Sequence, residues 1–222
     1  VVSYLLHVSM VLTFVFRSNS NELNNKVRLD ARMTSPLKTD EEVWGVSYLN
    51  ERQRIAKVEA NNRQALVASY SYTRRRMDNL IAPRHGYAAT LELSAGLNGL
   101  LNEANIARLF ARTSWLSPTR KRWQVIARAQ VGQVFGAQRE AVPSDLLFRA
   151  GGDQSVRGYG FNTLGVNQNN AIVGGRVSAV ASAELEYHLT PVWGVAVFRD
   201  MGNAADTWSD FKVVQGSGVG AR

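Results

Sequence analysis

The chain has 222 residues, 45% of them hydrophobic, and 26 Lys and Arg against 18 Asp and Glu give it a net charge of +8. It has no cysteine, which excludes disulfides and thiolate metal sites, and its three scattered histidines do not favour a metal cluster. The basic residues occur singly within apolar segments, which favours solvated positions over nucleic-acid binding. The chain starts without a methionine or signal peptide and stops in mid-pattern without a terminal cap, so we expect a piece of a longer protein.

Apolar and polar residues alternate with a period of two along most of the chain, which predicts β-strands with one apolar and one polar face. Residues 1–16 carry no formal charge but are too few for a membrane helix, which needs ~20 apolar residues, so a strand is favoured there. Residues 26–34 show the strictest alternation. Further strands are expected at residues 44–50, 66–72, 87–94, 107–115, 123–131, 177–189 and 193–200. Turns and loops are expected at residues 18–25, 36–40, 59–62, 83–86, 98–103, 117–119 and 190–191.

This pattern predicts about ten antiparallel strands, which could form a soluble sandwich or a transmembrane β-barrel. The strands are long, and their polar faces carry Arg, Glu and His at strand centres, as expected for a water-filled lumen. Aromatic residues recur at strand ends, as in the aromatic girdles of such barrels: Trp44, Tyr87, Trp115, Trp123 and Trp193. We therefore predict an all-β, antiparallel transmembrane β-barrel, with short proline turns on the periplasmic side and longer loops outside.

The longest connection, residues 137–172, is then an extracellular loop, and we expect it to fold into the lumen. Its stretch 147–161, LFRAGGDQSVRGYGF, mixes glycines with aromatic residues, which favours a compact packed loop over a linker. Phe148, Tyr159 and Phe161 are expected to leave water, which draws the loop inward. Arg157 keeps its charge there and needs carboxylate partners.

The strand pattern supplies two candidate partners for Arg157. A tight turn near Pro191 sets Ser182 opposite Asp200, with Glu184 one inward step along the strand, so these side chains would lie within ~5–8 Å of one another. One guanidinium between two carboxylates relieves their repulsion through charge-assisted hydrogen bonds. On spacing alone, this arrangement and two merely solvated acids are equally supported.

Residues 142–161, VPSDLLFRAGGDQSVRGYGF, resemble the signature loop of the BamA/TamA superfamily of bacterial outer-membrane assembly proteins. The resemblance extends to Gly174–Gly175, to Ser182–Glu184 and to residues 193–202, WGVAVFRDMG, and Pro143–Asp145 look more like TamA than BamA. It implies that Arg157 of the VRGY motif projects into the barrel and meets Glu184 and Asp200. The other motif positions it marks are Gly151, Gly152, Asp153, Val156, Gly158, Tyr159 and Gly160 in the loop, and Ser182, Phe198 and Gly202 on the strands.

By this resemblance, residues 1–222 form part of a sixteen-stranded barrel in the outer membrane of a Gram-negative bacterium, with the first and closing strands and the POTRA domains missing. The implied function is non-enzymatic assembly and insertion of outer-membrane proteins. Expected partners are unfolded, autotransporter-like client proteins, a TamB-like inner-membrane protein, and the lipid bilayer with its lipopolysaccharide, with no cofactor, metal or nucleic acid. Arg199 departs from the pattern because it faces lipid, and we expect it near the outer rim, where a charge costs least.

Three alternatives stay open. The first is a two-partner secretion transporter, and the second is a passive pore in which Arg108, Arg112 and Arg128 favour anions. The third is an enzyme, although the chain has no nucleophile elbow, phosphate-binding loop or zinc-binding spacing. Glu184 and Asp200 could mimic a glycosidase pair, but no set of aromatic residues lines a cleft near them. The upstream sequence would separate assembly factor from pore, because several POTRA-like repeats favour assembly.

Overall fold

The computed structural model describes residues 7–19, 22–37, 40–55, 61–79, 81, 83–99, 101–168, 170–190 and 192–221. The strands are β1 (His7–Asn19), β2 (Glu22–Leu37), β3 (Asp40–Ile55), β4 (Asn61–Met77), β5 (Gly86–Gly96), β6 (Ile106–Leu116), β7 (Trp123–Phe135), β8 (Val166–Gln168), β9 (Ala171–Val173), β10 (Val177–His188), β11 (Gly194–Ala205) and β12 (Val214–Ala221). Two 3-10 turns, η1 (Arg139–Ala141) and η2 (Ser144–Leu146), follow β7.

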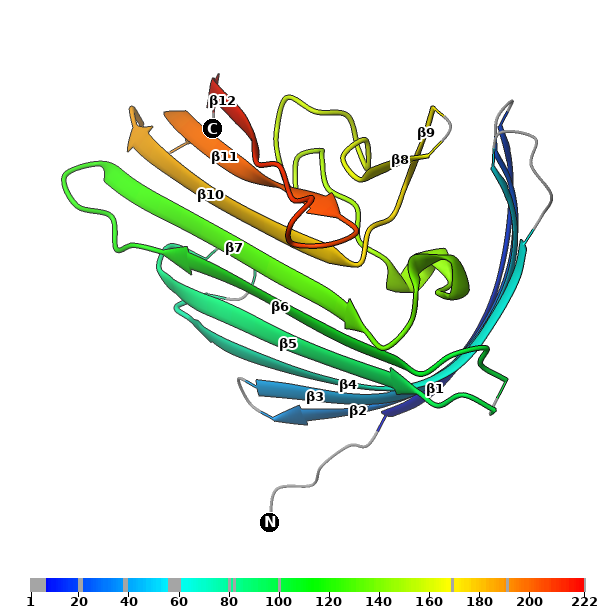
Figure 1. The fold of residues 1–222 in the computed structure, drawn as a ribbon. Coiled ribbons are helices and arrows are strands. Elements are labelled where there is room, and N and C mark those ends of the chain that lie inside the picture. Colours follow the sequence, from blue (N-terminus) through cyan, green and yellow to red (C-terminus); the bar gives the residue numbers. More distant parts are fainter. Residues whose placement is uncertain are drawn as a thin grey trace, which may run out of the picture.

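Ten of the strands form one antiparallel sheet in chain order, β1-β2-β3-β4-β5-β6-β7-β10-β11-β12, and β8 and β9 form a separate hairpin. The sheet curves strongly, and the segment between β7 and β10 lies on its concave side (Figure 1). Within the described residues, β1 and β12 are the two edges of this open sheet. No helix in the described part of the chain is long and apolar enough to cross a membrane.

The exposed fractions of side chains on the two faces of the sheet distinguish a transmembrane barrel from a soluble sandwich. On the convex face large apolar side chains are exposed, with Trp44 and Val197 each 51% exposed. On the concave face charged side chains are buried, with Glu51 2% and Asp200 0% exposed. A soluble sandwich would bury the first set and expose the second. Apolar outside and polar inside is the arrangement of a transmembrane barrel.

Several strands differ from their predicted extents. β12 was not predicted, because its sequence VQGSGVGA has glycines at the inward positions. Polar residues there would have shown the alternation between a polar and an apolar face. Pro36 lies within β2, opposite Glu41 of β3, instead of in a turn. The hairpin β8–β9 and the two 3-10 turns lie inside the long loop, where short segments have too few residues to show a period.

β4 is longer than its neighbour β5, and a side chain closes part of the resulting gap. β4 pairs with β5 only from Ala68 onward. Just beyond, the amide of Asn102 accepts a hydrogen bond from Leu66 N at 2.7 Å and donates one to Leu66 O at 3.0 Å. Asn102 is 6% exposed, so this amide takes the place of a strand residue where the ladder stops.

The turn after β4 has a pH-sensitive cap outside the membrane-spanning strands. The backbone N–H groups of His85 and Arg84 donate to Asp78 Oδ1 at 3.1 and 2.8 Å, and these bonds hold the pKa of Asp78 below its usual range. Because the folded pKa is depressed, the cap stabilises the turn above the ordinary carboxylate pKa and is lost as the pH falls through the folded value. We expect amide-exchange protection of Arg84 and His85 to fall in acid, and Asp78→Asn to remove that pH dependence. Identical acid profiles for the variant and the wild type would contradict the assignment.

Candidate functional site

The first part of the long loop packs against the concave face and forms an apolar cluster there. Its buried loop members are Ala137, Val142, Leu146, Leu147 and Phe148, and its strand members include Leu49, Ala65, Val67, Ile106 and Val134. These strand residues come from β3, β4, β6 and β7, so the loop reaches across the sheet. The interior of the barrel therefore has its own hydrophobic core at this level.

Phe148 is the central aromatic residue of this cluster. A Cβ on Gly132 of β7 would overlap the Phe148 ring, so the glycine provides the space into which the ring fits. Phe148 stacks on Phe110 at a centroid distance of 5.9 Å, and the Arg108 guanidinium lies 4.7 Å from the Phe148 centroid. Phe161 was also expected to leave water, but this prediction was wrong: its side chain is 81% exposed. Tyr159 is half-buried against Ala150, Val156 and Val180.

The second part of the loop brings Arg157 against β10 and β11. Arg157 Nε and Nη2 donate to Asp200 at 2.7 and 2.8 Å, and Nη1 donates to Glu184 at 2.5 Å. The backbone N–H of Arg157 also donates to Asp200, at 3.0 Å. Ser182 donates to Asp200 at 2.6 Å and accepts from Arg157 Nη2 at 3.2 Å. Ser182 lies opposite Asp200, the register expected from the turn near Pro191.

The geometry makes this a buried, bidentate ion pair with a second carboxylate attached. The side chain of Asp200 is 0% exposed, that of Glu184 is 2%, and that of Arg157 is 15%. The fork of the guanidinium matches the two oxygens of Asp200, and its remaining donors reach Glu184 and Ser182. Both acids are occupied by a cation, which leaves neither free for acid or base chemistry.

Two neighbours of this ion pair were missed or not given a role at the sequence level. The Phe198 ring lies 3.6 Å from the Arg157 guanidinium carbon, so the cation stacks on an aromatic face. Gly216 of β12 lies opposite Asp200, and a Cβ there would overlap the Arg157 carbonyl. Gly218 likewise makes room for the Phe198 ring. Glycine at alternate positions of 214–221 was the available signal, since it marks a close approach of another backbone.

The remaining motif positions mostly shape the loop. Gly151, Gly152 and Gly158 have positive φ angles of 100°, 96° and 93°, which L side chains rarely adopt. Val156 is fully buried, whereas Asp153 is exposed. A Cβ added to Gly160 would crowd the Thr163 side chain. A Cβ added to Gly202 would overlap the Ala179 carbonyl. No group of His, Asp and Glu suited to hold a metal occurs among the described residues.

A second anchor, which the sequence did not reveal, holds the loop to the opposite wall. The backbone N–H and the hydroxyl of Ser144 donate to Glu51 of β3 at 2.6 and 2.7 Å. Arg63 of β4 donates to the Val142 carbonyl at 3.3 Å, and Arg28 of β2 lies 3.7 Å from Asp145. The loop is thus fixed both to β10–β11 and to β2–β4.

We expect Ser144→Ala to weaken this anchor by about 1–3 kcal/mol, because it removes a hydrogen bond to a buried carboxylate. Thermal unfolding of the purified protein measures the loss. Ser114→Ala is the matched control, since Ser114 faces the same interior but has no hydrogen-bond partner among the described residues. Equal losses in the two variants would contradict an anchor at Ser144.

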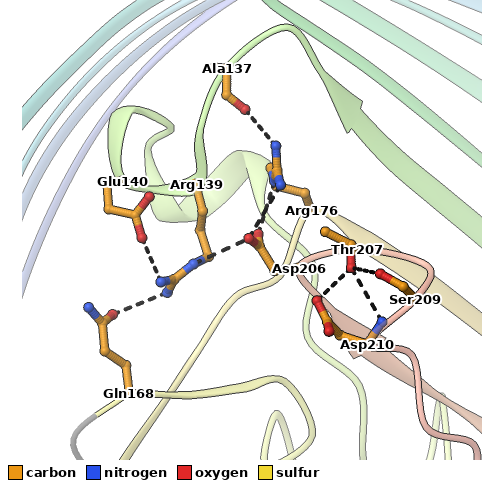
Figure 2. Close-up of polar contacts among 9 residues, drawn as sticks. All are labelled: Ala137, Arg139, Glu140, Gln168, Arg176, Asp206, Thr207, Ser209 and Asp210. Atoms are coloured by element: carbon orange, nitrogen blue, oxygen red, sulfur yellow. Dashed lines mark hydrogen bonds and ion pairs between the residues drawn. The ribbon is translucent and has the colours of Figure 1, made fainter.

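A third network joins both ends of the loop to the connection between β11 and β12 (Figure 2). Asp206 accepts from Arg176 Nε at 2.9 Å and lies 3.8 Å from Arg139 Nε. Arg139 also donates to Gln168 at 3.1 Å, and Arg176 donates to the Ala137 carbonyl at 3.2 Å. In the same connection, Thr207, Ser209 and Asp210 hydrogen bond with one another. The two ends of the loop are therefore clamped beside each other.

Arg199 lies on the convex face in the middle of β11, and its expected height near the outer rim of the membrane stays a prediction. Its guanidinium donates to Gln215 Oε1 at 2.5 Å, and its cross-strand neighbour is Ser217. A polar group on β12 thus satisfies part of the hydrogen-bonding need of this charge. Neither residue was considered at the sequence level, because β12 itself was not predicted.

Comparisons with known proteins agree with this architecture. The Omp85 superfamily domain matches residues 6–221. Among solved structures, the fold is similar to that of BamA from Haemophilus ducreyi lacking POTRA domains 1–3, with a TM-score of 0.78 and 15% sequence identity. The match covers 96% of this chain but 51% of that one, so the chain spans about half of the similar structure. The predicted antiparallel barrel fold and the predicted family are both confirmed, and the chain belongs to the Omp85 superfamily.

Proposed function

We propose that this chain is part of a TamA-like factor that assembles and inserts proteins into the outer membrane without enzymatic chemistry. Membership of the Omp85 superfamily, whose members include outer-membrane assembly factors, supports the general function. The TamA-like assignment rests on the Pro143–Asp145 motif, whose serine makes the Glu51 anchor. By the same reasoning we propose unfolded, autotransporter-like clients, a TamB-like partner, and contact with the lipid bilayer and its lipopolysaccharide.

The observation that carries the proposal is the contact of Arg157 with Asp200 and Glu184. We propose that residues 137–172 are an extracellular loop folded into the lumen, and that this ion pair is a latch that holds the loop on β10 and β11. If the latch keeps β10 and β11 rigid, the shape changes needed for insertion would occur in other parts of the barrel. An unpaired strand edge can then pair with a client strand through backbone hydrogen bonds.

Two observations weigh against a passive anion pore. The loop packs an apolar cluster onto the concave face, where a conducting path would need open water. Arg108, one of the arginines considered for anion selectivity, lies 3.4 Å from Glu92 and donates to the Leu146 carbonyl at 3.2 Å. It is therefore a structural cation and not a free one. No comparable observation favours a two-partner secretion transporter over an assembly factor.

The proposal is tested by replacing Arg157 in the full-length protein and measuring the amount of folded outer-membrane client in cells that lack the wild-type copy. We expect Arg157→Ala to reduce folded client because the loop loses its charged contact with the wall. Arg149→Ala is the matched control, since Arg149 lies in the same loop but makes no polar contact with the described residues. Wild-type client levels with Arg157→Ala would contradict the latch, and unchanged clients in cells lacking the protein would contradict the assembly function.

A further inference from the structure

A polar cavity of about 490 Å³ lies on the concave face of the sheet, between the strand wall and the loop residues that precede Arg157. Strands β4 to β7 and β10 form its wall, and Gln154 and Ser155 form its loop side. None of the described residues that line it is Asp or Glu, although it borders the site where two acids bind Arg157. Its charged lining residues are Arg75, Arg112 and Arg128.

Arg112 and Arg128 lie diagonally to each other on neighbouring strands. In the pairing of β6 with β7, Arg112 is opposite Gln130 and Arg128 is opposite Ser114. Diagonal residues on one face of a sheet lie roughly 7–8 Å apart at the backbone, within reach of long side chains. The two guanidinium groups therefore face the same space.

Arg112 and Arg128 form no ion pair with the described residues, unlike Arg75 and Arg108 of the same concave face. Arg75 lies 2.9 Å from Glu41, and Arg108 lies 3.4 Å from Glu92. For Arg112 and Arg128, the described part of the chain provides no ion pair or hydrogen-bond partner. Arginine stays protonated in proteins, so two permanent positive charges that form no ion pair with the described residues line the cavity. Their mutual repulsion is relieved by an anion placed between them.

The loop side of the cavity adds hydrogen-bond donors. The Ser155 Oγ accepts a hydrogen bond from Gly151 N at 3.2 Å, which leaves its own proton free to donate. Gln154 is exposed at the cavity and offers a side-chain amide. Two guanidinium forks with nearby hydroxyl and amide donors fit a doubly charged tetrahedral oxyanion, which accepts several charge-assisted hydrogen bonds. Because the cavity lies on the side away from the apolar convex face, its ligand reaches it from water.

We propose that this cavity binds a small phosphate-type oxyanion, held by Arg112 and Arg128 on the wall and by Gln154 and Ser155 on the loop. Such an ion joins the loop to β6 and β7, strands that the contacts of Arg157 do not reach. It stabilises the docked loop independently of Asp200 and Glu184. This inference stands apart from the assembly function, since it concerns only a ligand and the stability of the folded chain.

The test uses the full-length protein in detergent micelles, with inorganic phosphate as the probe and sodium chloride at matched ionic strength as the reference. We expect phosphate to raise the unfolding temperature by about 2–4 °C in a saturable way, because a ligand that binds only the folded state stabilises it. Equilibrium dialysis with labelled phosphate should find one site per chain. In the double variant Arg112→Gln/Arg128→Gln we expect both signals to disappear.

The controls separate a site from general screening of charge. Arg32→Gln removes one positive charge from the same concave face but outside the cavity, and it should keep the full response to phosphate. The double variant should fold in chloride at least as stably as the wild type, since two repelling charges have been removed. Equal stabilisation by phosphate and chloride, or loss of the response in Arg32→Gln, would overturn the proposal. Labelled phosphate that still binds the folded double variant would overturn it as well.

Discussion

Replacing Asp200 with alanine is expected to lower the free energy of unfolding by about 3–5 kcal/mol, the usual cost of breaking a buried ion pair from one side. Asp200 accepts hydrogen bonds from the guanidinium and backbone of Arg157 and from Ser182, and it is 0% exposed. Its loss leaves several buried donors without an acceptor. Heat or denaturant unfolding in detergent, followed by electrophoretic mobility, measures the change.

The matched control for this prediction is Asp153→Ala, which removes an exposed acid from the same loop and should change stability by less than about 0.5 kcal/mol. The pair itself is tested by the charge exchange Arg157→Asp with Asp200→Arg. The double variant should lose less free energy of unfolding than the two single variants lose together, because opposite charges again face each other. A coupling energy of zero would contradict direct contact between the two side chains.

Replacing Gly216 with valine is expected to displace the loop from β11 and β12, with a cost of about 1–3 kcal/mol from overpacking. The new side chain would enter the space of the Arg157 carbonyl, and backbone atoms cannot rotate away as a flexible side chain can. The displaced loop should be cleaved faster by added protease than in the wild type. Limited proteolysis, with the cleavage sites mapped to residues 137–172, measures the effect.

Gly220→Val serves as the control, because a Cβ at Gly220 meets no atom within 4 Å and the residue lies on the same strand. Its loop should resist protease as well as the wild-type loop does. If Gly216→Val left the loop equally protected, the close approach of β12 to Arg157 would not matter for docking.

Most of the sheet could be predicted from the sequence, because a strand with one lipid face and one wet face must alternate with a period of two. The same alternation, combined with a tight turn near Pro191, gave the pairing of Ser182 with Asp200. That register depends only on local geometry. The register alone left the partners of Arg157 undecided, and it was the family resemblance that pointed to Asp200 and Glu184. The role of this contact as a latch stays a proposal.

The contacts that could not be predicted depend on the curvature of the sheet and on glycine residues. Ser144 reaches Glu51 because the sheet curves around the loop (Figure 1), and the alternation of residue types does not predict that curvature. β12 was missed because Gly216 and Gly218 give no contrast between faces. Phe161 was expected inside because of its apolar ring alone, but it is 81% exposed.

The anchor between Ser144 and Glu51 also bears on how the molecule folds. The two residues are 93 positions apart in the chain, so their contact is strongly non-local, and we expect it to form after the hairpins between neighbouring strands. The apolar cluster around Phe148 needs strands β3, β4, β6 and β7 in place before its members can meet. In water-soluble domains a hydrophobic core commonly helps to nucleate folding, whereas here we expect the core to form only after β3 to β7 have paired. Folding of this chain would then end with the interior, after the wall has been built in the membrane.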